Sequence, residues 1–209
     1  MATSKTKLKA GNGGTLAAGR ESLSPADWEQ GALELIAEKG VAGLRVEPLA
    51  RRMGITKGSF YWHFSDRDAL LRKALQRWEE LDDQHLSVFE NSTDDPLDNL
   101  RAFFRRTSRQ QLTHRVYSAL LAGSQDVTIR AVLRRVTERR LAFLTKAYER
   151  LGYASGRAAL HAQLTYNAYV GLIQLMPQGM APAPDTTAYD SYTEYMIEVL
   201  LDEPEAINR

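Results

Sequence analysis

The chain has 209 residues, 44% hydrophobic and 25% charged, which excludes a disordered or collagen-like protein and leaves room for one domain or two small ones. It has no cysteine, which excludes a disulfide scaffold, a thiolate zinc site and a cysteine nucleophile. Because 27 lysines and arginines offset 26 aspartates and glutamates, any basic surface must arise from local segregation of charge. The longest apolar stretch, near residues 168–176, is too short to span a bilayer, and the N-terminus lacks the apolar core of a secretory signal. We therefore expect a cytoplasmic protein with no membrane contact.

Helix signals begin after residues 1–23, which are rich in Lys, Gly, Ser, Thr and Ala and are expected to form a disordered tail. Ser24 and Pro25 predict a capped helix start, and Gly40 predicts the end of that helix. Three more helices are expected in the first half of the chain, over residues 46–53, over residues 57–63, and from Asp66 or Arg67 to residue 89.

The second half of the chain continues in the same way. After a break at residues 91–96, Asp95 and Pro96 begin a helix that is expected to end near Gly123. Further helices are predicted over residues 127–151, over residues 155–176 and, after a Pro/Gly/Ala loop at 177–184, from Asp185 or Thr186 to residue 201. The sequence therefore predicts an all-α protein of about nine helices.

Charge is segregated along the chain although it cancels in total. Between Arg45 and His63 there are four basic residues and one acidic residue, Glu47. Between Glu79 and Asp98 there are eight acidic residues and no lysine or arginine. The first region suits an anionic polymer and the second does not.

The segment over residues 44–71 carries the most information about function. Phe60 and Phe64, four residues apart on a short helix, are expected to face the same core, which turns Lys57, Ser59, Tyr61, Trp62 and His63 mostly away from it. Three aromatic rings and a lysine on an exposed face are typical of the second helix of a helix-turn-helix, which enters the major groove of DNA. The alternative is a helical hairpin whose aromatic side chains are simply buried.

The residues GITKGSFYWHF at positions 54–64, followed by DRDALL at 66–71, closely resemble the DNA-binding signature of TetR-family transcriptional regulators. The resemblance implies a three-helix head over residues 24–71 on a long linking helix, and a C-terminal helical bundle over residues 72–209 that dimerises and binds a ligand. It also implies roles for individual residues. Base reading falls to Lys57, Gly58 and Ser59, phosphate or sugar contact to Tyr61, Trp62 and His63, helix capping to Thr56, and backbone contact to Arg67. Arg45 stands where the family usually has a capping threonine; it can reach phosphate but is not expected to cap the helix.

Polar and aromatic residues set among apolar ones on the middle helices are candidates for a ligand pocket: Trp78, His85, Phe104, His114, Tyr117, Tyr148, Tyr166 and Asn167. Each of them can alternatively be a core residue whose polar groups are hydrogen-bonded within the protein. The set predicts an apolar or aromatic effector with one or two polar groups. The arginines over residues 101–109 and 130–140 recur at helical spacing and are interpreted as solvated faces; the alternative is a site for an acidic effector.

The last two predicted helices are apolar over more of their surface than one neighbour can cover, which predicts a two-fold homodimer. The expected interface residues are Tyr169, Leu172, Ile173, Met176, Tyr192, Met196 and Val199. The alternative is a large monomeric core.

Enzyme motifs are missing from the sequence. The four histidines stand far apart, with no HExxH motif, phosphate-binding loop or nucleophile elbow, so we expect no enzyme, metal or cofactor. We expect a homodimeric, ligand-released repressor of a palindromic operator in double-stranded DNA, and an all-α enzyme or binding module for an aromatic or lipophilic small molecule is the alternative. The helix carrying Trp78 and His85 is expected to transmit the effector signal, because it alone is predicted to run from the head into the bundle.

Overall fold

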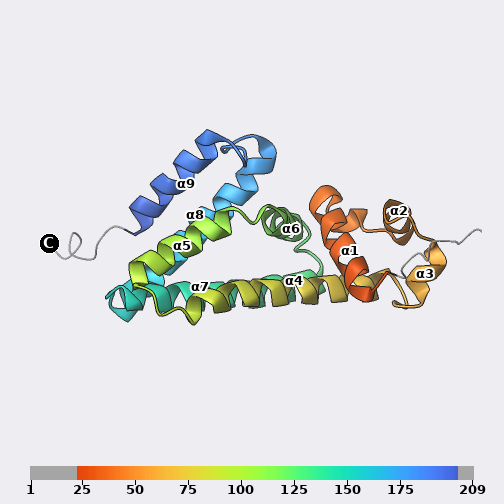
Figure 1. The fold of residues 1–209 in the computed structure, drawn as a ribbon, viewed down its shortest axis with the longest axis horizontal. Helices are drawn as coiled ribbons and strands as arrows, with labels where there is room; N and C mark the ends of the chain where they lie inside the picture. Colours follow the sequence, from red (N-terminus) through yellow and green to blue (C-terminus); the bar gives the residue numbers. More distant parts are fainter. Residues whose placement is uncertain (1–22, 202–209) are drawn as a thin grey trace, which may run out of the picture.

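The computed structural model describes residues 23–201, and within that range the chain forms nine α-helices, two short 3₁₀ helices and no strand. Figure 1 shows an elongated molecule, with the first three helices at one end and the last helices at the other. The elements in chain order are α1 (Pro25–Lys39), η1 (Val41–Gly43), α2 (Val46–Arg52), α3 (Lys57–Tyr61), α4 (Arg67–Glu90), α5 (Pro96–Ser108), α6 (Gln111–Ala122), α7 (Val127–Arg150), α8 (Ser155–Leu175), η2 (Met176–Gln178) and α9 (Thr187–Leu200). The all-α prediction is confirmed. The predicted tail lies outside the described residues, except for Leu23.

Helix starts follow the capping signals in the sequence. The Ser24 side chain accepts a hydrogen bond from the Asp27 amide at 3.3 Å, and the Asp27 carboxylate accepts one from the Ser24 amide at 2.7 Å, which closes a capping box. Asp95 and Asp126 accept bonds from the first backbone amides of α5 and α7. Thr56 occupies the cap position of α3 but makes no side-chain capping bond, so the predicted capping role is wrong; its carbonyl instead accepts from the Ser59 amide at 3.1 Å.

The helix predicted from Pro96 to Gly123 is in fact two helices. Gln110 leaves the helical region with ψ at 63°, and α5 ends one residue before Arg109. The break lets α5 pack against α9 while α6 packs against α1 and α8, which one continuous helix could not do. At the end of α5 the Tyr189 hydroxyl donates to the Ser108 carbonyl at 2.8 Å, so α9 satisfies a backbone group that the break leaves free.

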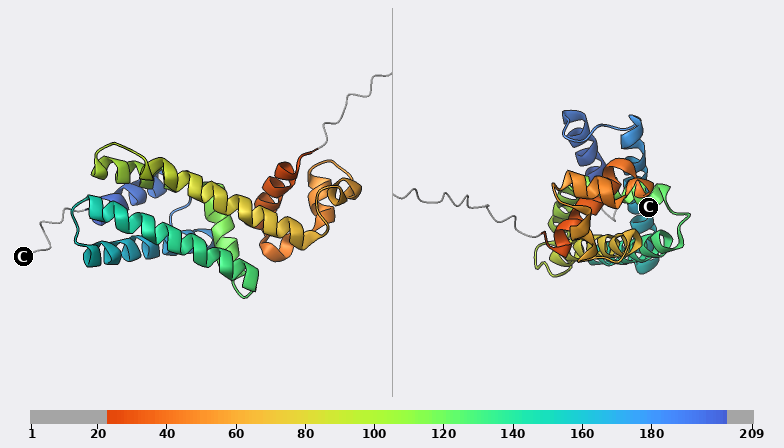
Figure 2. Two further views of the ribbon diagram at one scale, coloured as in Figure 1. Left: turned by 90° about the horizontal axis from the view of Figure 1, so that it is seen from below. Right: turned by 90° about the vertical axis from the view of Figure 1, so that its right-hand side faces the viewer.

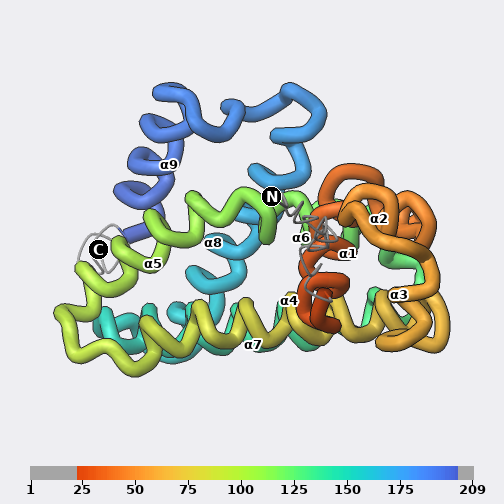
Figure 3. Tube along the Cα trace, turned by 45° about the vertical axis from the view of Figure 1, so that its right-hand side comes forward, coloured from red at the N-terminus to blue at the C-terminus, as the bar shows by residue number. Residues whose placement is uncertain are grey.

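The three-helix head is joined to the rest of the chain by two helices. Helix α4 starts under the head and runs beside α7, as Figure 2 shows. Helix α6 also packs against α1, and Figure 3 shows it between the head and the rest of the bundle. Helix α4 alone starts at the head and extends into the bundle, as expected, and α6 adds a second contact that was not predicted, because the α5–α6 break turns α6 towards α1.

Helices account for most of the described chain. None of its helices pairs sufficient length with sufficient apolar character to cross a lipid bilayer.

Candidate nucleic-acid interface and effector cavity

The head places α3 by burying one aromatic side chain. Phe60 is fully buried, with its ring 5.3 Å from the ring of Trp28 on α1 and 5.5 Å from that of Phe64. Gly54 makes the turn between α2 and α3 with φ at +69°, a conformation that side chains with a Cβ rarely adopt. The Ile55 amide then donates to the Ala50 carbonyl at 3.0 Å, which closes the turn. These local contacts fix the direction in which the rest of α3 faces.

The opposite face of α3 is open to solvent. Trp62 is 87% exposed and Tyr61 is 56% exposed, although large rings are among the side chains that most favour burial. Thr56, Lys57, Gly58 and His63 are exposed as well, and Ser59 is half-buried. The buried-hairpin alternative is therefore wrong for Tyr61 and Trp62, and the predicted outward face is present.

Basic residues gather in a groove beside α3. Arg45, Arg51, Lys57 and Arg67 line it together with Tyr61, from the start of α2 to the start of α4. Lys57 Nζ lies 2.7 Å from the Glu47 carboxylate, the nearest acidic group in the groove, and this contact raises the pKa of Lys57 and lowers that of Glu47. Arg45 and Arg51 are exposed and form no ion pair within the described residues. As expected, Arg45 makes no capping bond at the start of α2.

Arg67 has a structural role that its sequence position did not indicate. Its Nε donates to the Leu44 carbonyl at 3.2 Å and its Nη2 donates to the Val41 carbonyl at 2.8 Å. Its Nη1 pairs with Asp68 at 2.7 Å. The guanidinium therefore ties the first turn of α4 to the segment that leads into α2.

Comparison with known proteins places the head in a family. The model for "Bacterial regulatory proteins, tetR family" matches residues 30–74. The class A tetracycline repressor protein of Escherichia coli transposon 1721 is 43% identical over 49 residues, 23% of each chain, and the class C protein is 45% identical over 40 residues, 19% of this chain and 18% of that one. These matches cover less than a quarter of the curated relatives.

Solved structures extend the similarity in fold to most of the chain. A TetR transcriptional regulator from Legionella pneumophila superposes with a TM-score of 0.73 over 86% of this chain and 98% of that one, at 15% identity. A TetR-family regulator from Agrobacterium tumefaciens gives a TM-score of 0.67 over 84% of this chain and 98% of that one, at 20% identity. Residues 30–74 therefore match the TetR family, and most of the chain shares the fold of TetR-family regulators.

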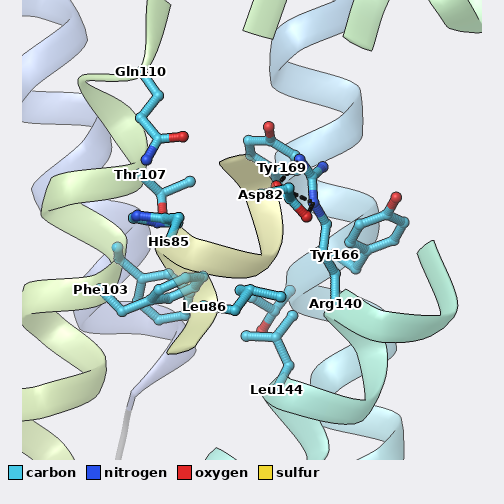
Figure 4. A pocket seen from close by; sticks show the side chains of 12 residues that line it. Asp82, His85, Leu86, Phe103, Thr107, Gln110, Arg140, Leu144, Tyr166 and Tyr169 are labelled. Atoms are coloured by element: carbon cyan, nitrogen blue, oxygen red, sulfur yellow. Dashed lines mark hydrogen bonds and ion pairs between the residues drawn. The ribbon is translucent and has the colours of Figure 1, made fainter. Parts of the chain in front are cut away.

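The bundle contains two adjoining cavities of about 60 Å³ each. Both are lined by Phe104, Thr107, Thr165 and Tyr169, and about half of the other lining residues are Leu, Ile, Met or Phe. Figure 4 shows the first cavity, with His85 and Phe103 on one side and the paired side chains of Asp82 and Arg140 on the other. The lining comes from α4, α5, α6, α7, α8 and α9, so helices from the whole bundle meet there.

Four of the eight predicted ligand residues line these cavities: His85, Phe104, His114 and Tyr166. The placement of the other four is corrected. Trp78, Tyr117 and Tyr148 are buried core residues. The Tyr148 hydroxyl shares a hydrogen bond with Thr165 Oγ1 at 2.6 Å and donates to the Leu200 carbonyl at 3.1 Å. Asn167 is exposed on α8, where it accepts from Gln163, because one residue along a helix turns it away from the inward Tyr166.

Buried histidines line the cavities in their uncharged form. Burial, with a smaller contribution from the charge of Arg106, lowers the pKa of His85 from 6.5 to about 4. Burial, reinforced by Arg140, lowers the pKa of His114 from 6.5 to about 4. His85 Nε2 shares a hydrogen bond with Thr107 Oγ1 at 2.9 Å.

Sequence reasoning missed the main polar feature of the cavity, the pair of Asp82 on α4 and Arg140 on α7. Arg140 is only 8% exposed, so its interpretation as part of a solvated face is wrong. A signal was available, since Asp82 lies four residues from Trp78 and three from His85 and so shares their apolar face.

The predicted dimer face is also corrected in part. Ile173 is buried within the subunit, Met176 is half-buried, and Tyr169, Leu172 and Met196 line the cavity. Tyr192 and Val199 are exposed as expected. The exposed apolar residues of the last two long helices are Leu160, Leu164 and Leu175 on α8 and Tyr192, Tyr195 and Val199 on α9. We call these six residues the outer apolar stripe.

Proposed function

We propose that this chain is a DNA-binding transcriptional regulator of the TetR family that acts as a homodimer on a palindromic operator and is released from it by a small molecule. The observation that carries the DNA-binding part is the exposure of Tyr61 and Trp62 beside a groove lined by arginines and a lysine. Exposure of large aromatic rings to water is unfavourable, whereas the phosphates, sugars and base edges of a DNA major groove can contact both the rings and the cations.

The likeness of the head to tetracycline repressor proteins supports repression as the mode of action. Lys57 and Ser59 are the side chains on α3 that would read base edges, since Gly58 between them offers no side chain. Arg45, Tyr61, Trp62, His63 and Arg67 would contact the DNA backbone.

The outer apolar stripe supports the homodimer. Leu164 is 58% exposed and Tyr195 is 62% exposed, and an exposed apolar patch of this kind marks an interface. A two-fold interface on α8 and α9 leaves the two heads free and relates them by symmetry, which requires a palindromic site with one half for each head.

The cavity supports release by an effector. It adjoins α4 through Asp82, His85 and Leu86, and it adjoins α6 through His114. Both helices contact α1 of the head. A ligand that favours a different placement of α4 and α6 would change the spacing of the two heads and weaken DNA binding by its difference in affinity for the two states.

The test of DNA binding is fluorescence anisotropy with labelled duplex DNA at several salt concentrations. We expect the logarithm of the binding constant to fall linearly with the logarithm of the salt concentration, as counterion release requires. Trp62→Ala and Lys57→Ala should weaken binding, and Arg134→Ala, which also removes one exposed cation but lies on α7, should leave it unchanged. No salt-dependent binding, or equal loss in the Arg134 variant, would contradict the proposed interface.

A further inference from the structure

The buried guanidinium of Arg140 uses only part of its hydrogen-bonding capacity. Its Nε donates to the Asp82 carboxylate at 3.1 Å, and its Nη2 donates to Asp82 Oδ1 at 2.6 Å. Its Nη1 has no hydrogen-bond partner within the described protein, although the side chain is only 9% exposed. Nearly all buried polar groups are hydrogen-bonded, so a donor of this kind requires an explanation.

A second unpartnered donor lies beside it. The hydroxyl of Tyr169 on α8 is buried and has no hydrogen-bond partner in the described part of the chain, and Arg140 Cζ lies 5.6 Å from the centre of the Tyr169 ring. Burial raises the pKa of Tyr169 to about 12, and the charge of Arg140 and its polar contact with the Tyr169 oxygen oppose that rise, so the hydroxyl keeps its proton at neutral pH. Figure 4 shows both side chains converging with Asp82 at one end of the first cavity.

The charge around these donors is already balanced. Asp82 and Arg140 are the charged side chains that line the two cavities, and they pair with each other. The two lining histidines are uncharged at neutral pH. A buried anion would therefore bring an uncompensated charge into an apolar space, or would have to displace Asp82 from Arg140 and leave that carboxylate unpaired; both are costly.

The apolar residues of the lining indicate that most of the ligand surface is apolar. Phe103, Phe104, Leu86 and Leu144 surround the first cavity, and Leu172, Ile173, Met196 and Ile197 surround the second. An apolar body fits this surface, and a hydrogen-bond acceptor without charge fits the free donors of Arg140 and Tyr169.

We propose that this cavity takes an uncharged, mainly apolar molecule with a carbonyl-type oxygen, which accepts hydrogen bonds from Arg140 Nη1 and the Tyr169 hydroxyl. The anchor joins three helices, since Asp82 belongs to α4, Arg140 to α7 and Tyr169 to α8. The proposal rests on the proposed function for the regulatory consequence of binding. The binding itself is measured without DNA.

The experiment is isothermal titration calorimetry of the full chain with three single-ring probes: acetophenone, the hydrocarbon ethylbenzene and the anion benzoate. A single ring is chosen because each cavity is small. The test variant is Tyr169→Phe, which removes a hydroxyl that has no protein partner and so leaves the fold intact. The control is Tyr195→Phe, which removes an exposed hydroxyl from α9.

We expect Tyr169→Phe to weaken acetophenone binding about 2- to 10-fold, the effect of one hydrogen bond, and to leave ethylbenzene binding unchanged. The control should change neither, and benzoate should bind more weakly than acetophenone. The ¹³C resonance of the acetophenone carbonyl should move downfield on binding to the wild-type chain and less in the variant. No saturable acetophenone binding, an equal effect of Tyr169→Phe on ketone and hydrocarbon, or tighter binding of benzoate would overturn the proposal. Acetophenone binding that obeys this pattern but does not alter operator affinity would instead contradict ligand release and leave the anchor in place.

Discussion

The two buried histidines predict that the protein loses stability in mildly acidic solution. His85 and His114 titrate near 6.5 in the unfolded chain, and burial lowers the pKa of each to about 4 in the folded chain. Between these values the unfolded state binds more protons than the folded state. The free energy of unfolding is therefore unaffected above pH 6.5, falls as the pH drops towards 4, and stops falling on their account below 4.

The magnitude follows from the same values. Lowering the pH from 7.5 to 5 costs about 2 kcal/mol of unfolding free energy for each histidine, or about 4 kcal/mol for the pair. That is a large part of the total stability of a typical domain, which is about 5–15 kcal/mol. His114→Phe keeps a ring against Tyr169, whose centre lies 5.5 Å away, and should remove about half of the loss.

The assay is urea unfolding followed by circular dichroism at fixed protein concentration, from pH 7.5 to 4.5, for the wild type and His114→Phe. The informative quantity is the difference between the two pH profiles, because the carboxylates titrate alike in both proteins. A difference that is constant over this range would refute the reasoning, since it would show that His114 gains its proton at the same pH in the folded and unfolded chains.

The remaining predictions concern the head and the outer apolar stripe. Arg67→Ala should lower the unfolding free energy by about 1–2 kcal/mol in urea titrations because it removes the hydrogen bonds to the Val41 and Leu44 carbonyls, and an unchanged midpoint would contradict this tie. Lys57→Ala should leave stability almost unchanged, because its pair with Glu47 is exposed to solvent. It should relax preference at one symmetric base pair by roughly 1–3 kcal/mol in competition binding, and equal losses on all sequences would assign it to the backbone instead. Leu164→Glu should convert a dimer of about 47 kDa, twice 23.5 kDa, into monomers in sedimentation. The control Val88→Glu, at an exposed apolar position on α4, should leave the dimer intact. A wild-type chain that is monomeric at micromolar concentration would contradict the homodimer.

The head was predictable because its signals are local. Ser24 and Asp27 close a capping box three residues apart, and Gly54 alone explains the turn before α3. Phe60 and Phe64 are four residues apart, so helical period assigns them to the core and turns Trp62 outward. The length of α3 was overestimated, since the helix ends at Tyr61 rather than His63.

The bundle was less predictable because its decisive contacts are long-range. The break at Gln110 has no glycine or proline to mark it and follows from the different partners of α5 and α6. The partners of the buried ion pair, Asp82 and Arg140, lie 58 residues apart in sequence, and each resembles a surface charge when considered alone. Helix α8 is apolar nearly all round, so periodicity could not decide whether Ile173 or Leu164 faces the subunit interior.

The central claim, sequence-specific DNA recognition by α3 in a two-fold dimer, is tested most directly by selection of bound sequences from a random pool of duplex DNA. The full chain and Lys57→Ala are carried through the same rounds at physiological salt. We expect the wild type to enrich an inverted repeat, and Lys57→Ala to lose preference at one base pair in each half-site while it keeps the spacing of the halves. Failure to enrich any sequence, or enrichment of a single asymmetric site, would contradict the account.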